Sequence, residues 1–336
     1  MEKRKLMSLG KSSLVIAIPK HWLKKSSLEK GDFVFLDTHS DGSLLIHPET
    51  TSKKNNKITL PIMVDDNGSS ILRRIIGCYL NGFSTIVLQS NKIFSVEQHL
   101  ATREAVRLLY MRIMESDSSK IVIQTLLDES MGSVSSGVNR MHMITRSMSE
   151  DVLNSLKNWD AKLASSVIAL EDDVDQFMYF ILRMIRLASQ DSLLARNLEL
   201  DMLDCLDFQT FVHRIEHVAD HLTNIAQNLM TLIEGKMVVP PGILSVIIEA
   251  AELAFDSYDL SFQSFLEKNV EQVDRIIENQ TVIIELGELI TPIPFSGNLE
   301  EKAAACPICA IRESVKRISE YSADIAELTI DRVYKK

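Results

Sequence analysis

The sequence predicts a multidomain chain with a small β-barrel, a short α/β middle unit and an all-α region of tandem three-helix bundles. Three observations support this prediction. Short β-branched and aromatic runs separated by turn residues occupy positions 1–50, strand and helix patterns alternate over 58–128, and long helical patterns follow one another over 130–336. A chain of 336 residues normally forms two or three domains, which agrees with these boundaries.

The first 50 residues contain apolar runs of the length of β-strands. These runs are Leu14–Ile18, Phe33–Leu36 and Leu44–Ile46. Pro19 is suited to start a short helix through Trp22, and Asp41-Gly42 indicates a hairpin turn, in which both central residues need a positive φ. A unit of about 50 residues cannot bury enough apolar surface to be stable alone. Because Phe33–Leu36 is apolar on both strand faces, we expect a homodimer.

These landmarks resemble the AbrB/MazE/SpoVT swapped-hairpin family. The resemblance rests on Gly10-Lys-Ser-Ser13, a strand ending in Ile18-Pro-Lys20, a helix with Trp22, Leu28-Glu-Lys-Gly-Asp32, and Asp41-Gly-Ser-Leu-Leu-Ile-His-Pro48. It implies an interleaved dimeric barrel that presents basic residues to double-stranded DNA, with an inverted-repeat site matching the two-fold axis. By position, it places these residues near the phosphates: Lys3, Arg4, Lys5, Lys11, Lys20, Lys24 and Lys25. The alternative is an antitoxin-like or purely dimerising barrel.

The charge distribution favours a basic patch at the start of the chain. Residues 1–57 carry eleven Lys or Arg against six Asp or Glu, a net charge of +5. The whole chain carries −10, so residues 58–336 carry −15. Non-specific DNA affinity requires a local cationic patch rather than a basic protein. The alternative is that these lysines merely solvate a small barrel.

The middle unit begins after a polar joint, Thr51–Lys57. The pattern predicts strands at 58–64, 84–88 and 120–127 and helices at 69–80 and 95–111. The segment Asp66-Asn-Gly-Ser-Ser70 lacks the glycine spacing and the lysine of a phosphate-binding loop. We therefore expect this unit to be a spacer or a support for the dimer.

The composition indicates a mostly helical cytoplasmic protein. No stretch reaches 18 uninterrupted apolar residues, so we expect no membrane insertion. The basic start is broken by Gly10–Ser13 and is not followed by a small-residue cleavage site, unlike a secretory signal. Four cysteines in a chain of this length are typical of a reducing compartment.

The remaining sequence predicts six long helices that form two copies of a three-helix unit. Their expected ranges are 130–158, 160–188, 200–233, 241–268, 270–290 and 302–334. The breaks are Gly235, Pro240-Pro-Gly242 and Pro292–Gly297. Residues 212–226 align with residues 312–326, which indicates an internal repeat.

The first copy contains acid pairs spaced by one helical turn. Glu171 and Asp175 share one helix face, as do Glu216 and Asp220 on a later helix. Two antiparallel helices that each present such a pair can form an oxygen-rich metal site. Three imidazoles lie on the later helix, at His213, His217 and His221. We include His217 among the expected ligands, because imidazole favours Fe, Zn, Mn or Ni over Mg²⁺ or Ca²⁺.

The acid spacing, the continuation Asp220-His-x-x-Asn-Ile-Ala226 and the doubled unit resemble PhoU, a family of phosphate-uptake regulators with metal-binding acidic motifs. The resemblance covers about residues 131–334. In the second copy Lys316 and Glu320 replace the Glu–Asp pair, and Val282 follows four residues after Glu278. A second full metal cluster is therefore not expected.

Simpler interpretations remain open for each signal. The acids near Glu171 could be a solvated helix face, and the histidines a surface stripe; His213 in particular fits that interpretation. His142 fits a partly buried bundle residue better than a ligand. Cys306-Pro-Ile-Cys309 has a redox or metal spacing, but no second pair completes a four-thiolate zinc site, so packed cysteines are the favoured interpretation.

Together the two resemblances imply a phosphate-responsive transcription regulator, of an archaeal type that pairs an AbrB-like and a PhoU-like domain on one chain. Phosphate status would reach the helical domain through a metal or through partner proteins. The alternative is a PhoU-type adaptor that contacts a phosphate ABC transporter or signalling proteins without binding DNA. An enzyme is not expected, because no nucleophile lies beside a base and an orienting acid.

Overall fold

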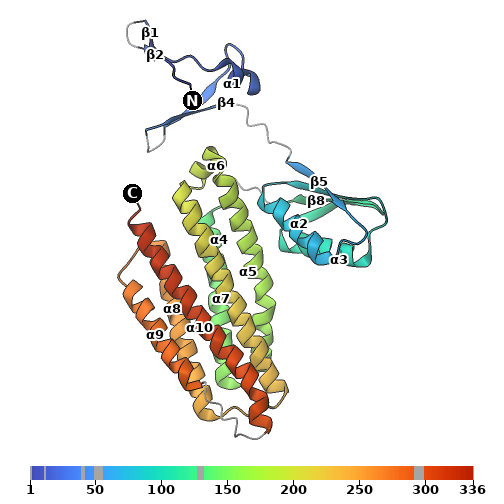
Figure 1. Cartoon of the computed structure of the whole chain (residues 1–336), viewed down its shortest axis with the longest axis vertical. Coiled ribbons are helices and arrows are strands. Elements are labelled where there is room, and N and C mark those ends of the chain that lie inside the picture. Colours follow the sequence, from blue (N-terminus) through green and yellow to red (C-terminus); the bar gives the residue numbers. More distant parts are fainter. Residues whose placement is uncertain are drawn as a thin grey trace. The chain divides into compact units, whose positions relative to one another are not determined.

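The computed structural model describes residues 2–10, 13–38, 42–48, 56–126, 132–290 and 299–335. It divides into two compact units, Met1–Asn56 and Lys57–Lys336 (Figure 1). The predicted predominance of helix is confirmed, because the second unit contains seven helices between residues 134 and 333.

The first unit contains two antiparallel strand pairs and one short helix. Strand β1 (Met7–Leu9) pairs with β2 (Ser13–Val15), and β3 (Val34–Thr38) pairs with β4 (Leu44–Pro48). Helix α1 (Lys20–Lys25) follows Pro19, which occupies the N-cap rather than the first helical position. The described residues of one chain form two separate two-stranded sheets and not a closed barrel. Asp41, half of the predicted hairpin turn, lies outside the described residues, whereas Gly42 has φ +79°.

The first unit has no apolar interior of its own among its described residues. None of them is buried, and Phe33, Leu14 and Leu9 are 74%, 66% and 64% exposed. Strands with this much exposed apolar surface require another surface to cover them. The exposure fits the reasoning behind the expected dimer, whose second copy would provide that surface.

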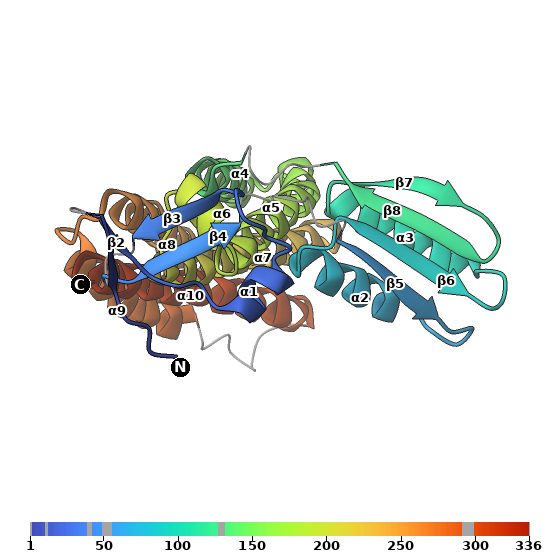
Figure 2. The same cartoon turned by 90° about the horizontal axis from the view of Figure 1, so that it is seen from above.

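The second unit begins with a four-stranded sheet covered by two helices. The elements are β5 (Lys57–Ile62), α2 (Gly68–Leu80), β6 (Thr85–Ser90), α3 (Val96–Leu108), β7 (Met111–Ser116) and β8 (Lys120–Thr125). Strands β5 and β6 are parallel, whereas β8 runs antiparallel to both β6 and β7, in the order β5-β6-β8-β7. Both helices lie on the same face of the sheet (Figure 2).

The predicted strands and helices of this sheet are confirmed, with one correction. The sequence prediction extended the second helix to Met111 and missed β7. Helix α3 begins with a capping box of Ser95 and Gln98, and it ends at Leu108 because Tyr110 takes a left-handed φ of +48°. The chain then reverses into β7, which was not predicted because the helical pattern of the preceding residues was extended to Met111.

The six long predicted helices are confirmed, and one short helix is added. The long helices are α4 (Val134–Asn158), α5 (Ala161–Ala188), α7 (Met202–Glu234), α8 (Pro241–Glu267), α9 (Val273–Ile290) and α10 (Leu299–Val333). The added helix is α6 (Ser192–Asn197). Helices α4, α5 and α7 pack against one another, and so do α8, α9 and α10, as the repeat predicts (Figure 1). The predicted break at Pro292–Gly297 lies outside the described residues.

The two three-helix units begin with hairpins of the same construction. Helix α4 is followed by the C-cap residue Trp159 with φ +56°, and α8 by the C-cap residue Lys268 with φ +53°. The next residue, Asp160 or Asn269, then accepts backbone N–H bonds through its own side chain. The two copies of the repeat therefore share this turn conformation, although their residues at the turn differ.

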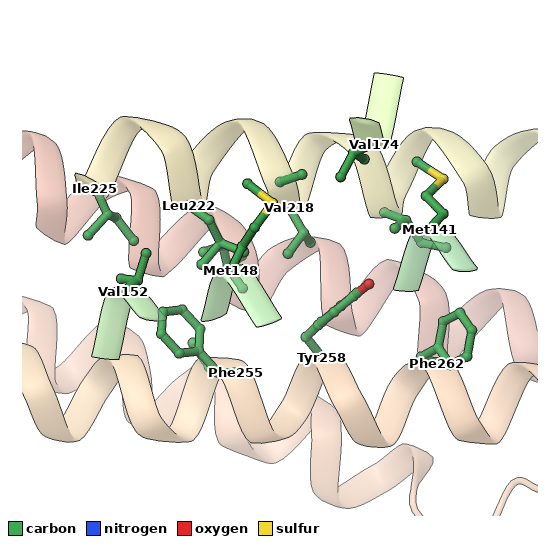
Figure 3. Close-up of a cluster of buried hydrophobic side chains, with 14 of the residues drawn as sticks. Met141, Met148, Val152, Val174, Val218, Leu222, Ile225, Phe255, Tyr258 and Phe262 are labelled. Atoms are coloured by element: carbon green, nitrogen blue, oxygen red, sulfur yellow. The ribbon is translucent and has the colours of Figure 1, made fainter. Parts of the chain in front are cut away.

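One continuous core joins the two three-helix units. Met148 and Val152 of α4 face Val218 and Leu222 of α7, and Phe255 of α8 completes the same cluster (Figure 3). The two three-helix units are therefore not separate bundles, because α8 of the second unit contributes side chains to the core of the first unit. Within the described residues, no helix combines the length and apolar character needed to cross a membrane.

Arg183 of α5 binds the end of helix α2 in the sheet unit. Its side chain is 2% exposed and donates hydrogen bonds to the carbonyl oxygens of Tyr79, Gly82 (3.1 Å) and Phe83 (3.1 Å). Its guanidinium carbon also lies 4.6 Å from the centre of the Tyr79 ring. The last carbonyls of a helix have no N–H group of a following turn to accept from, and this arginine brings a charged donor to three carbonyl oxygens at this helix end.

We expect Arg183→Met to destabilise the second unit by about 3–5 kcal/mol, because it removes three hydrogen bonds from a buried charged donor. Arg186→Met removes one bond to the Asn81 side chain and is expected to cost about 1 kcal/mol. Urea unfolding measures the difference, and amide exchange at the end of α2 locates it. Equal losses in the two variants would contradict this role.

Candidate functional site

Four carboxyl groups lie near enough to influence one another's pKa where α5 packs against α7. Glu171 and Asp175 lie on α5, and Glu216 and Asp220 lie on α7. Each pair is separated by one turn, and buried Val174 and Val218 hold the two helices together beside them. The structure thus brings together the two acid pairs that the sequence places on different helices.

The carboxyl groups of this cluster resist ionisation. Burial, with the charges of Asp220 and Glu171, raises the pKa of Asp175 to about 7. Burial, with the charges of Asp220 and Asp175, raises the pKa of Glu216 to about 8. The pKa of Glu171 and the pKa of Asp220 are also raised, first by burial. Like charges in a poorly hydrated space disfavour one another's charged form, so these carboxyl groups keep their protons to a higher pH than isolated ones.

The histidines of α7 lie toward α10. The centre of the His217 ring lies 5.0 Å from that of Tyr321, and its Nε2 lies 3.5 Å from Glu216 Oε2. His221 Nδ1 is 3.2 Å from the Ser314 hydroxyl. Burial lowers the pKa of both histidines, and the neighbouring Arg317 lowers both further, so the neutral form is favoured. His217 is thus a neutral imidazole beside Glu216.

The donor atoms of the cluster are suited to a cation, but its side chains are not arranged around one. Four carboxylates supply hard oxygen donors, and the neighbouring charges that raise the pKa of Asp175 and the pKa of Glu216 are those of other acids. Even so, among the described residues no three His, Cys, Asp or Glu side chains are placed to hold one metal ion. The side chains of Glu171, Asp175, Glu216 and Asp220 would have to converge on the ion by rotamer changes.

In the second copy of the repeat, the acid at the equivalent position, Glu320, has cationic partners. Lys316 Nζ lies 3.6 Å from Glu320 Oε1, and Arg317 Nη1 lies 2.6 Å from Glu320 Oε2. Two cations therefore surround the Glu320 carboxylate. That no second full cluster forms stays a prediction.

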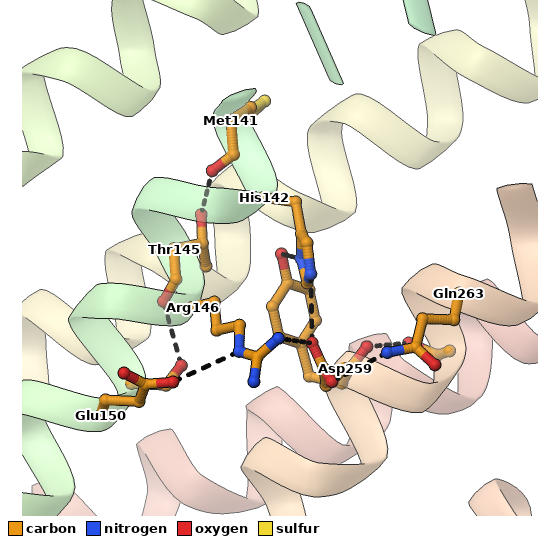
Figure 4. A network of polar contacts seen from close by, with 10 residues as sticks. Met141, His142, Thr145, Arg146, Glu150, Asp259 and Gln263 are labelled. Atoms are coloured by element: carbon orange, nitrogen blue, oxygen red, sulfur yellow. Dashed lines mark hydrogen bonds and ion pairs between the residues drawn. The ribbon is translucent and has the colours of Figure 1, made fainter. Parts of the chain in front are cut away.

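A buried histidine network lies between α4 and α8, away from the acid cluster. His142 Nε2 is 3.1 Å from Asp259 Oδ1, its Nδ1 is 3.2 Å from the Tyr258 hydroxyl, and its ring stacks on Phe262 at 3.6 Å. Arg146 reaches toward Asp259 from the solvent side (Figure 4). Burial lowers the pKa of His142 to about 4, so the ring is neutral and structural. Sequence reasoning expected a buried bundle residue at this position but did not find its partners on α8.

The predicted DNA-binding residues are accessible in the first unit. Six of them are described and all are exposed: Lys3, Arg4, Lys5, Lys20, Lys24 and Lys25. Arg4 forms an ion pair with Glu2 at 2.5 Å. Lys11 lies outside the described residues.

Comparisons with known proteins identify the type of the helical region. Residues 138–229, which carry the carboxylate cluster, match the PhoU domain family. The crystal structure of the phosphate transport system regulatory protein PhoU from Streptococcus pneumoniae is similar, with a TM-score of 0.50 and 15% identity over 59% of this chain and 91% of that chain. PhoU from Pseudomonas aeruginosa gives a TM-score of 0.47 and 19% identity over 59% of this chain and 93% of that one. No curated protein matches the chain.

The predicted PhoU-like helical bundle is thereby confirmed. The AbrB-like nature of the first 50 residues stays a prediction.

The raised pKa values predict a pH-dependent stability. Asp175 and Glu216 titrate at about 7 and about 8 in the folded chain, above their ordinary values of 3.8 and 4.5. The folded state therefore holds more protons than the unfolded state across this interval, and stability falls as the pH rises through it. We expect Glu216→Gln to weaken this loss and to stabilise the protein by about 1–2 kcal/mol at about pH 8.

Urea unfolding between about pH 5 and 8 measures the effect. Glu150→Gln, a change at an exposed acid of α4, is the matched control and should follow the unmodified protein. A pH slope that is identical in all three proteins would show that the cluster does not bind excess protons.

Proposed function

We propose that the chain is a phosphate-responsive transcription regulator rather than an enzyme. In this proposal the PhoU-like helical region senses phosphate status, and the first unit binds double-stranded DNA as a homodimer. The observation that carries it is the PhoU domain match over the same helices that hold the carboxylate cluster. A cytoplasmic location belongs to the same proposal.

The sensing site is the carboxylate cluster, with a divalent or trivalent metal as its ligand. Glu171, Asp175, Glu216 and Asp220 would hold the ion, and His217 is the imidazole that can reach it from Glu216. A bound cation supplies the positive charge that the cluster lacks, and the mixed oxygen and nitrogen donors suit Fe, Zn, Mn or Ni. Phosphate status then reaches the protein through this metal or through partner proteins.

The DNA-binding end is the first unit. Its exposed lysines supply cations for phosphates, and its exposed apolar strands need a second copy to cover them. A two-fold dimer of this kind would recognise an inverted repeat. Regulation requires linkage: the ligand of the helical region must favour one arrangement of the two DNA-binding units, or no signal is transmitted.

The alternative function is that of an adaptor without DNA affinity. The similar protein from Streptococcus pneumoniae is described as a phosphate transport system regulatory protein, which favours contact with transport proteins. An adaptor would retain a phosphate transporter in a pull-down and would show no duplex affinity even in dilute buffer.

The DNA-binding proposal predicts a strong and salt-dependent affinity for duplex DNA. Arg4→Ala with Lys5→Ala removes four cations from a dimer, so the slope of log affinity against log salt should decrease by about four. Affinity in dilute buffer should fall roughly tenfold or more. Fluorescence anisotropy with a labelled duplex at several salt concentrations measures both quantities.

Lys162→Ala with Arg275→Ala removes the same charge from exposed positions of the helical region and serves as control. It should bind as the unmodified protein does. The proposal fails if the purified chain is monomeric in sedimentation, or if both double variants bind alike.

The metal proposal predicts stabilisation by a divalent cation. With Mn²⁺ at about 100 times its Kd, the melting temperature should rise by about 5–10 °C, because the ion binds only the folded cluster. Asp175→Asn and Glu216→Gln should each abolish the rise, and Glu150→Gln should retain it. Elemental analysis of the purified protein and the Glu216 variant checks for metal that is already bound. Equal shifts in all variants would place the ion elsewhere.

A further inference from the structure

Two cysteines near the start of α10 are unusually accessible. Cys306 is exposed and Cys309 is partly exposed, whereas Cys78 and Cys205 are buried. A free cysteine that acts only as a small apolar side chain is normally buried, as these last two are. The structure therefore corrects the favoured interpretation of Cys306 and Cys309 as a packed pair.

The two thiols lie on the same side of the helix, one turn apart. Residues three apart on a helix are neighbours, and Ile308 and Ile311, each 1% exposed, occupy the opposite side of this turn. The other positions one turn from Cys306 include Ala303 and Ala310, whose methyl groups give little cover. The sulfur of Cys306 can therefore be approached from solvent.

Pro307 lies inside the helix between the two thiols. A disulfide needs Cβ atoms about 3.5–4.5 Å apart, whereas residues three apart on an α-helix keep theirs at about 5–6 Å. The turn must tighten toward a 3₁₀ conformation to close this gap, since residues i and i+3 eclipse there. Proline has no N–H, so this turn already lacks the bond to the carbonyl of Ala303 and has fewer α-helical bonds to lose.

We propose that Cys306 and Cys309 form a reversible dithiol–disulfide pair that exchanges with low-molecular-weight disulfides. The thiolate of Cys306 attacks one sulfur of the small disulfide, forms a mixed disulfide and releases one small thiolate. The thiolate of Cys309 then attacks Cys306 Sγ, closes the intramolecular disulfide and releases the second thiolate. The protein loses two electrons and two thiol protons, and the small disulfide is reduced to two thiols. This site is independent of the carboxylate cluster and of DNA binding.

The remaining cysteines provide an internal comparison. Burial raises the pKa of the Cys78 thiol and that of the Cys205 thiol, which lowers the fraction of reactive thiolate. Their sulfurs are also covered, so both should stay reduced under conditions that oxidise the pair on α10.

The test treats the full-length protein with mixtures of glutathione and glutathione disulfide, followed by alkylation of free thiols and peptide mapping. Cleavage after Lys302 and Arg312 places both cysteines on one peptide, 303–312. We expect this peptide to lose two hydrogen atoms and to escape alkylation, while Cys78 and Cys205 are alkylated only after unfolding. Reduction with excess glutathione should restore both thiols.

Single variants separate the two roles. Cys309→Ser should accumulate a mixed disulfide with glutathione at Cys306, because the resolving thiol is gone. Cys306→Ser should react about tenfold more slowly, since its remaining thiol is less accessible. Ala310→Ser, a neighbouring change that keeps both thiols, should behave as the unmodified protein. The proposal is overturned if the unmodified peptide keeps both thiols at every ratio, or if oxidation stops at the mixed disulfide.

Discussion

The packing of α5 against α7 keeps four carboxyl groups close together in spite of their mutual repulsion. Val174 and Val218 are fully buried beside the acids, and the burial of one such side chain contributes about 1.5–3 kcal/mol. That packing fixes the faces of α5 and α7, so Asp175 and Glu216 cannot separate to relieve their repulsion. They keep protons to an unusually high pH instead. The packing of Val174 and Val218 thus maintains an unfavourable electrostatic interaction among the acids, which a bound cation would relieve.

Helix α5 connects this cluster with the sheet unit. Asp172, next to Glu171, forms an ion pair with Arg107 of α3 at 2.5 Å, and Arg183 lies three turns further along the same helix. Between them, Tyr179 packs against the cores of both parts. A rearrangement of α5 around a ligand would therefore be shared with the sheet, and β5 begins where the first unit ends.

The features that the sequence predicted correctly are those determined by neighbouring residues in the chain, such as helix ends and shared helix faces. Helix ends follow capping residues such as Asp160 and breaks such as Pro241, so the six long helices were found with small errors. The acid pairs were found because an i,i+4 spacing fixes a shared face. The direction of His217 was not predictable, since a helical wheel does not say which neighbour covers which side. Arg183 was missed because its acceptors lie about 100 residues away, in a turn that carries no sequence signal for it.

The difference between the two repeats suggests where a signal would act. Both have the same hairpin at their start, but the first has four acids with raised pKa values, whereas Lys316 and Arg317 form ion pairs with Glu320 in the second. In the proposed function a cation would therefore act first on the acids of the first repeat. The first repeat is also the one whose α5 binds the sheet unit through Arg183. The acids that would hold the ligand thus lie on the helix that adjoins the sheet and on its neighbour α7.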